Sequence, residues 1–267
     1  MNIAAFPQRP DALPQGEKEN ALKLPQDRPL CTIRLGVESI DAACGGGLAA
    51  GTHQAAGQGA AALGFGLGLM ARVLAATPTA RVLLVQTREA ANEAGRAYAP
   101  GLHAFGLDPD RVGVVRAPSQ AEALRVVDEA LRSGAAAAVL ADLGDAPRLD
   151  LSVTRRFNLS ARRCGALALM VTRDLDATSA ALTRWRVEAC PSRGRRRRLG
   201  RPAFGLCLVR NRLGPTGEWT LEWDSDDRVF RPPPPLSAPL ARPVVDRPDP
   251  ARPAGAGDAP GAYRQAG

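Results

Sequence analysis

Short apolar runs alternate with helical patterns along the middle of the chain, and this alternation restricts its possible folds more than any other feature. Residues 82–85 and 112–115 are short apolar runs that predict buried strands. Residues 135–142 and residues 166–172 predict two more. Because helical patterns and short joints separate the strands, the sequence predicts an α/β fold in which helices cover both faces of a parallel sheet.

Two of the predicted helices have clear start and end signals. Ser119 and Glu122 form the pattern S-x-x-E, a capping box that begins a helix, and Gly134 ends that helix. A later helix ends at Gly165, and its apolar face consists of Val153, Phe157, Ala161 and Cys164. These signals place the two helices between the predicted strands, as an α/β fold requires.

The pattern changes after residue 185. Residues 204–210 and 218–223 alternate around the turn signal LGPTG, which predicts an antiparallel hairpin at the edge of the sheet. Residues 231–267 contain ten prolines and residues 1–29 contain five. Since proline fits neither a helix interior nor a central strand, we expect two disordered tails around one domain over residues 30–230.

The segment after the strand-like residues THQAA has the position of a phosphate-binding loop but lacks its chemistry. Such a loop reads G-x-x-x-x-G-K-[ST], in which the lysine reaches the outer phosphates and the hydroxyl holds magnesium. From Gly57 this chain reads GQGAAALG, so Ala62 replaces the second glycine, Leu63 the lysine and Gly64 the hydroxyl residue. We therefore predict that the chain is not an enzyme, has no catalytic residues, and needs no nucleotide or other cofactor.

The remaining residue types also argue against metal or redox chemistry. None of the five cysteines forms a C-x-x-C pair, which predicts reduced thiols in a cytoplasmic protein and no metal site. We interpret His53 and His103 as structural residues. No apolar run approaches the length of about 18 residues that a membrane span needs, so we expect no membrane span.

Positive charge is concentrated in one region. Residues 148–212 hold sixteen arginines and four acidic residues, although the net charge of the whole chain is only +8. An arginine-rich loop there can bind the phosphates of nucleic acid, dock on an acidic protein, or be merely solvated, and the sequence leaves all three interpretations open. Its residues are Arg193, Arg195, Arg196, Arg197, Arg198 and Arg201.

The order of these pieces resembles the core of the RecA recombinase. LGVESIDAACGGGLAAG is similar to the recombinase segment before its phosphate loop, and Asp142 falls at the place of its magnesium aspartate. The place of its catalytic glutamate holds Thr87 and Arg88, with Glu89 one position late. The strand CLVRNRL resembles the recombinase strand whose two basic residues reach the neighbouring subunit, and the corresponding residues here are Arg210 and Arg212.

Over roughly residues 30–230, this core together with the motif TRWRVEACPS and the ending LGRPAFGLCLVRNRLGPTGEWTLEWD resembles the ImuA family of damage-inducible mutagenesis proteins. The resemblance implies an accessory role in SOS-induced translesion DNA synthesis. It implies as partners the ImuB-like inactive relative of Y-family polymerases, RecA and, indirectly, an error-prone replicative-type polymerase. Two alternatives are a SulA-type inhibitor of cell division and a general nucleic-acid-binding protein.

Overall fold

The structure is a computed structural model that describes residues 32–145, 149–175, 178–192 and 200–234. The predicted N-terminal tail, Arg193, Arg195–Arg198 and nearly all of the proline-rich C-terminal stretch lie outside these ranges. The predicted disorder of the two ends and the binding role of those arginines therefore stay predictions.

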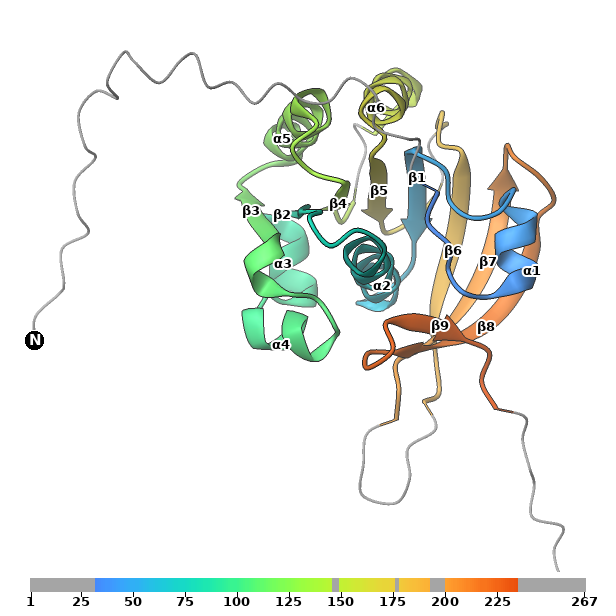
Figure 1. Cartoon of the computed structure of the whole chain (residues 1–267). Helices are drawn as coiled ribbons and strands as arrows, with labels where there is room; N and C mark the ends of the chain where they lie inside the picture. Colours follow the sequence, from blue (N-terminus) through green and yellow to red (C-terminus); the bar gives the residue numbers. More distant parts are fainter. Residues whose placement is uncertain (1–31, 146–148, 176–177, 193–199, 235–267) are drawn as a thin grey trace, which may run out of the picture. The chain divides into compact units, whose positions relative to one another are not determined.

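Residues 32–233 form an α/β fold around one sheet, whose described strands follow the order β3-β2-β4-β5-β1-β6-β7-β8-β9 (Figure 1). Neighbouring strands from β3 to β6 pair in parallel, and the later pairs are antiparallel. This architecture is consistent with the predicted RecA-like core. The strands are β1 (Gly51–Ala56), β2 (Val82–Thr87), β3 (Val112–Ala117), β4 (Ala138–Asp142), β5 (Leu167–Thr172), β6 (Thr183–Cys190), β7 (Ala203–Asn211), β8 (Gly217–Asp224) and β9 (Val229–Arg231).

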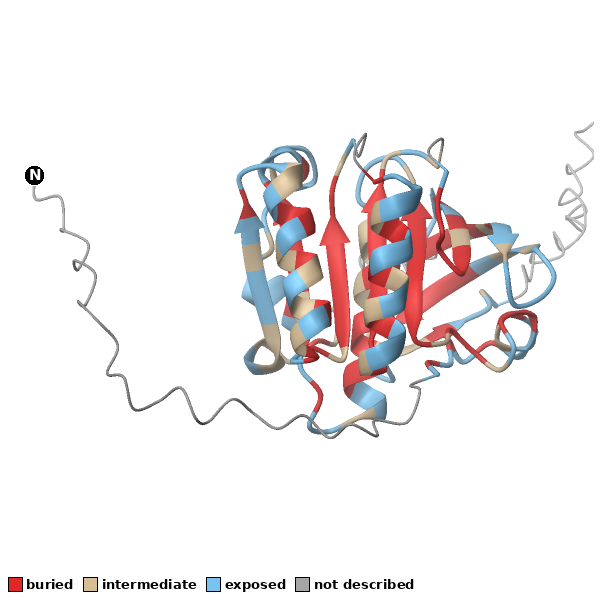
Figure 2. Ribbon diagram, turned by 90° about the horizontal axis from the view of Figure 1, so that it is seen from above, coloured by how far each residue is buried: buried red, intermediate tan, exposed pale blue. Residues whose placement is uncertain are grey.

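Helices lie on both faces of the sheet and bury two apolar clusters. Phe65 and Leu69 of α2 belong to a cluster on one face, whereas α5 and α6 contribute Val127 and Phe157 to a cluster on the other face. In Figure 2 the buried strands lie directly behind α5 and α6. The α-helices are α1 (Glu38–Ala43), α2 (Ala61–Ala76), α3 (Arg88–Ala94), α4 (Ala99–Ala104), α5 (Gln120–Ser133) and α6 (Leu151–Cys164), and a 3₁₀ turn η2 spans Pro109–Arg111.

The local signals predicted the helix ends correctly. The Ser119 hydroxyl accepts a hydrogen bond from the Glu122 backbone N–H at the start of α5. Gly134 and Gly165 end α5 and α6 in the left-handed conformation that glycine adopts without strain. All four predicted parallel strands are confirmed.

One expectation about the C-terminal part was wrong in detail. The β7–β8 hairpin is not at the edge of the sheet, because β6 joins it to β1 and β9 pairs with its outer side. In β6, Thr183, Trp185 and Val187 are buried and the residues between them are not, so this strand has only a half-buried pattern. The helix after the loop, α2, begins at Ala61, and small residues fill its first turn.

A buried chain of hydrogen bonds connects β1 to β6. The indole N–H of Trp185 donates to the Thr183 hydroxyl at 2.7 Å, and that hydroxyl lies 2.7 Å from Nδ1 of His53. Nε2 of His53 lies 2.8 Å from the Ala49 carbonyl, which can only accept. His53 is therefore neutral with its proton on Nε2, and its complete burial lowers its pKa to about 4. These buried hydrogen bonds agree with the prediction that His53 is a structural residue.

Candidate functional site

The loop between β1 and α2 crosses the end of β6 at very short range. A β-carbon at Gly57 would lie 2.0 Å from the Val187 carbonyl oxygen, so only glycine fits there. The Gly57 backbone N–H donates to the Thr172 carbonyl of β5 at 3.3 Å, and Gly59 adopts a positive φ of 62°. The first glycine of the loop is thus required by strand packing, and no bound phosphate is needed to explain it.

The positions that would do phosphate chemistry are apolar and packed. Ala62 is buried, and Leu63 packs against the apolar cluster under α2. A β-carbon at Gly64 would lie 3.2 Å from the ring of Phe204 on β7. A side chain at position 64 would therefore meet an aromatic ring.

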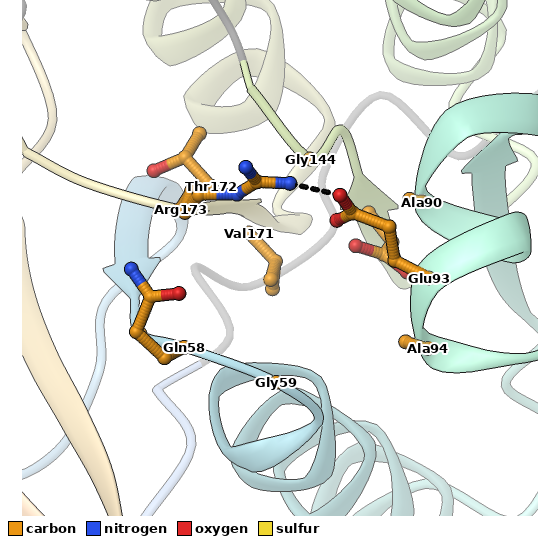
Figure 3. Close-up of a pocket in the computed structure, with 11 residues that line it drawn as sticks. Gln58, Gly59, Ala90, Glu93, Ala94, Gly144, Val171, Thr172 and Arg173 are labelled. Carbon is orange, nitrogen blue, oxygen red and sulfur yellow. Dashed lines mark hydrogen bonds and ion pairs between the residues drawn. The ribbon is translucent and has the colours of Figure 1, made fainter.

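A pocket of about 440 Å³ lies beside this loop, at the carboxyl ends of β4 and β5 (Figure 3). Ligands of open α/β sheets bind at this end of the strands. Arg173, which follows β5, forms ion pairs with Glu93 of α3 and, at 3.1 Å, with Asp145 after β4. Figure 3 shows the Arg173 guanidinium directed at Glu93. Among the described residues that line this pocket, Arg173 is the only arginine or lysine, and it is bound to the protein's own carboxylates.

Asp142 is in the predicted position at the end of β4, where it lines this pocket. Burial raises the pKa of its carboxyl group, and a 3.1 Å hydrogen bond from the Gln86 amide opposes that shift. The Thr87 hydroxyl, at the expected place of a catalytic glutamate, accepts from the Ala90 N–H and caps α3. Both residues thus have roles within the fold.

These residues do not fit a magnesium nucleotide. Such a ligand needs a lysine amine and a magnesium-binding hydroxyl in the first turn of α2, and Leu63 and Gly64 supply neither. Within the described ranges, no group of three or more His, Cys, Asp or Glu side chains is placed to hold a metal ion. In the same part of the chain, no helix has both the length and the apolar character needed to cross a membrane.

The predicted arginine sites that the structure describes, Arg201, Arg210 and Arg212, do not line this pocket. Arg201 lies just before β7 and forms a 2.7 Å ion pair with the buried Asp224 carboxylate. Arg210 and Arg212 are exposed at the other end of β7. The structure therefore separates Arg201 from the pair predicted to form a subunit interface.

Sequence reasoning missed Arg173, Glu93 and Asp145. The rule that ligands bind beyond the carboxyl ends of parallel strands could have selected Arg173 and Asp145, because they follow two predicted strands. No local signal indicates that Glu93, on a short helix, reaches the same pocket.

Comparison with known proteins finds a similarity to Protein ImuA. No family model matches the chain. Protein ImuA from two strains of Caulobacter vibrioides, NA1000 / CB15N and ATCC 19089 / CIP 103742 / CB 15, is 32% identical to it over 142 residues. The chain is related to ImuA. The match covers 47% of the chain and 55% of ImuA, so the chain spans about half the length of the curated relatives it matches. The relationship to ImuA agrees with the resemblance found in the sequence motifs.

Proposed function

We propose that this chain is a non-catalytic RecA-like accessory protein of damage-induced mutagenesis that acts through partners and not through nucleotide hydrolysis. The observation that carries the proposal is the loop after β1. Leu63 and Gly64 stand at the positions of the lysine and the hydroxyl residue of an active phosphate loop. The similarity to ImuA supports a role in damage-induced mutagenesis.

The proposed partners are the ImuB-like inactive polymerase relative and RecA, with an error-prone replicative-type polymerase recruited indirectly. A RecA-like fold that does not turn over nucleotide can present a recombinase-type surface without cycling between nucleotide states. Arg210 and Arg212 are exposed, as this role requires. Direct contact with DNA through the arginine-rich loop is part of the same proposal.

Deletion of the gene tests the cellular role. We expect the frequency of mutations induced by DNA damage to fall to the uninduced level while growth without damage stays normal. The full-length gene restores induced mutation, and a Leu63→Ala variant does so equally well because position 63 serves only packing. Unchanged induced mutagenesis in the deletion strain would refute the proposal. Filamentation of cells on overexpression would instead favour the SulA-type alternative.

A further inference from the structure

Exposed apolar side chains concentrate on two neighbouring segments. In the described part of the chain, six large apolar side chains are exposed, and four of them lie on α6 or at the end of β7. They are Leu151, Leu159, Val209 and Leu213, with exposed fractions of 44%, 56%, 38% and 43%. Single exposed apolar residues are ordinary, but a concentration of them marks an interaction surface.

The outer face of α6 combines this apolar character with positive charge. Leu159 has Arg155 four residues before it and Arg162 and Arg163 three and four residues after it, so all three guanidinium groups share its side of the helix. These arginines are exposed, and residues 151–164 contain no acidic side chain. Arg156, which faces α5, is bound to Asp128 at 3.2 Å and does not belong to this face.

The end of β7 repeats the combination. Arg210 and Arg212 are exposed between Val209 and Leu213, and residues 203–213 contain no acidic side chain. Arg210 also pairs directly across the strands with Arg184. The Arg184 guanidinium donates to the Gln54 side-chain oxygen at 3.2 Å, whereas Arg210 is exposed.

Contacts through the start of β1 join the two segments. The site of a β-carbon on Gly51 lies 2.7 Å from the Asn158 side chain of α6 and 2.6 Å from the Leu182 side chain. The Leu182 carbonyl in turn accepts a hydrogen bond from the Arg212 backbone N–H at 2.8 Å. Gly51 and Leu182 therefore link α6 to the end of β7 within the fold.

We propose that this basic–apolar surface, formed by Arg155, Leu159, Arg162, Arg210, Arg212 and Leu213, docks an acidic segment of a partner protein that carries apolar side chains. Phosphate groups would engage the arginines but gain nothing from the leucines, whereas a protein segment with Asp or Glu beside apolar residues complements both. An arginine in the last turn of α6 interacts favourably with the helix dipole, so helix stability can explain Arg162. It does not explain Arg155, which is outside the last turn, or the exposed Leu159. The inference deepens the proposed function by naming the surface that its partners contact.

The test measures binding of the full chain to the purified ImuB-like protein and to RecA by interferometry. A double variant, Arg155→Ala with Arg162→Ala, is compared with Arg125→Ala plus Arg132→Ala, which removes the same charge from exposed positions on α5. If the two α6 arginines are energetically dominant, the α6 variant binds one partner about 30-fold or more weakly, and the α5 variant binds like the wild type. Leu159→Ala weakens the same interaction, and thermal unfolding verifies that all variants fold.

The other outcomes separate the two proposals. If a partner binds the wild type and the α6 variant equally well, the docking surface is wrong while the proposed function stands. Equal weakening by both double variants would reduce the effect to net charge and also overturn the surface. If the wild type binds neither protein, both proposals fail. A loss confined to binding of fluorescein-labelled single-stranded DNA, with protein binding intact, would make this a nucleic-acid surface and contradict the inference.

Discussion

Lowering the pH from 7 to 4 is expected to remove about 3 kcal/mol of folding stability through His53 alone. Its pKa falls from 6.5 to about 4 in the folded protein because burial disfavours the charged ring. Below pH 6.5 the unfolded chain therefore binds a proton that the folded chain excludes, and each unit of the difference corresponds to about 1.4 kcal/mol. The contribution is complete above pH 6.5 and is lost as the pH falls toward 4.

Urea unfolding at a series of pH values measures this loss. The variant His53→Gln lacks the titrating ring, so its stability should change less between pH 6.5 and 4 than that of the wild type. His103→Gln is the matched control, because the chain has two histidines and His103 is exposed. A wild-type slope that His53→Gln leaves unchanged would show that another group controls acid stability.

Replacing Gly57 by alanine is expected to cost about 3 kcal/mol, at the upper end of overpacking effects. The new methyl group would meet the Val187 backbone oxygen at 2.0 Å, and a strand backbone cannot yield as a flexible side chain can. The loop and β6 must then separate, which also weakens the pairing of β1 with β6.

Gly59→Ala provides the comparison within the same loop. Gly59 has a positive φ of 62° and open space around its Cα, so alanine there suffers only backbone strain of about 1 kcal/mol. Thermal unfolding of both variants decides between packing and conformational freedom. Equal destabilisation would mean that the close approach of Gly57 to β6 does not explain its presence.

Short sequence signals correctly predicted the helix ends, because those ends depend on interactions between residues close in sequence. Ser119 and Gly134 mark the ends of α5 by capping interactions that depend on nearby residues only. The sequence did not predict β6 as a parallel neighbour of β1, because its half-buried pattern is that of an antiparallel hairpin strand. It did not predict β9 because that strand has only three residues. Strand order depends on contacts between residues that are far apart in the sequence.

The sequence likewise predicted only part of the candidate site. The missing chemistry at Leu63 and Gly64 could be predicted from a motif, since the motif fixes the role of each position. The Phe204 ring against Gly64 and the ion pairs of Arg173 could not, because β7 and α3 reach the loop only in the folded chain. The roles of Arg193 and Arg195–Arg198 stay predictions, as do those of Arg210 and Arg212.

Phosphate release from ATP is the decisive measurement for the proposed non-catalytic role, because that role requires a RecA-like fold that does not hydrolyse nucleotide. The purified full-length chain is incubated with ATP and magnesium, alone and with single-stranded DNA. At every protein concentration we expect phosphate to be released at the same rate as in buffer without protein. If the rate rises in proportion to protein concentration, and Asp142→Ala abolishes this release, the chain hydrolyses ATP and the proposed non-catalytic role is wrong.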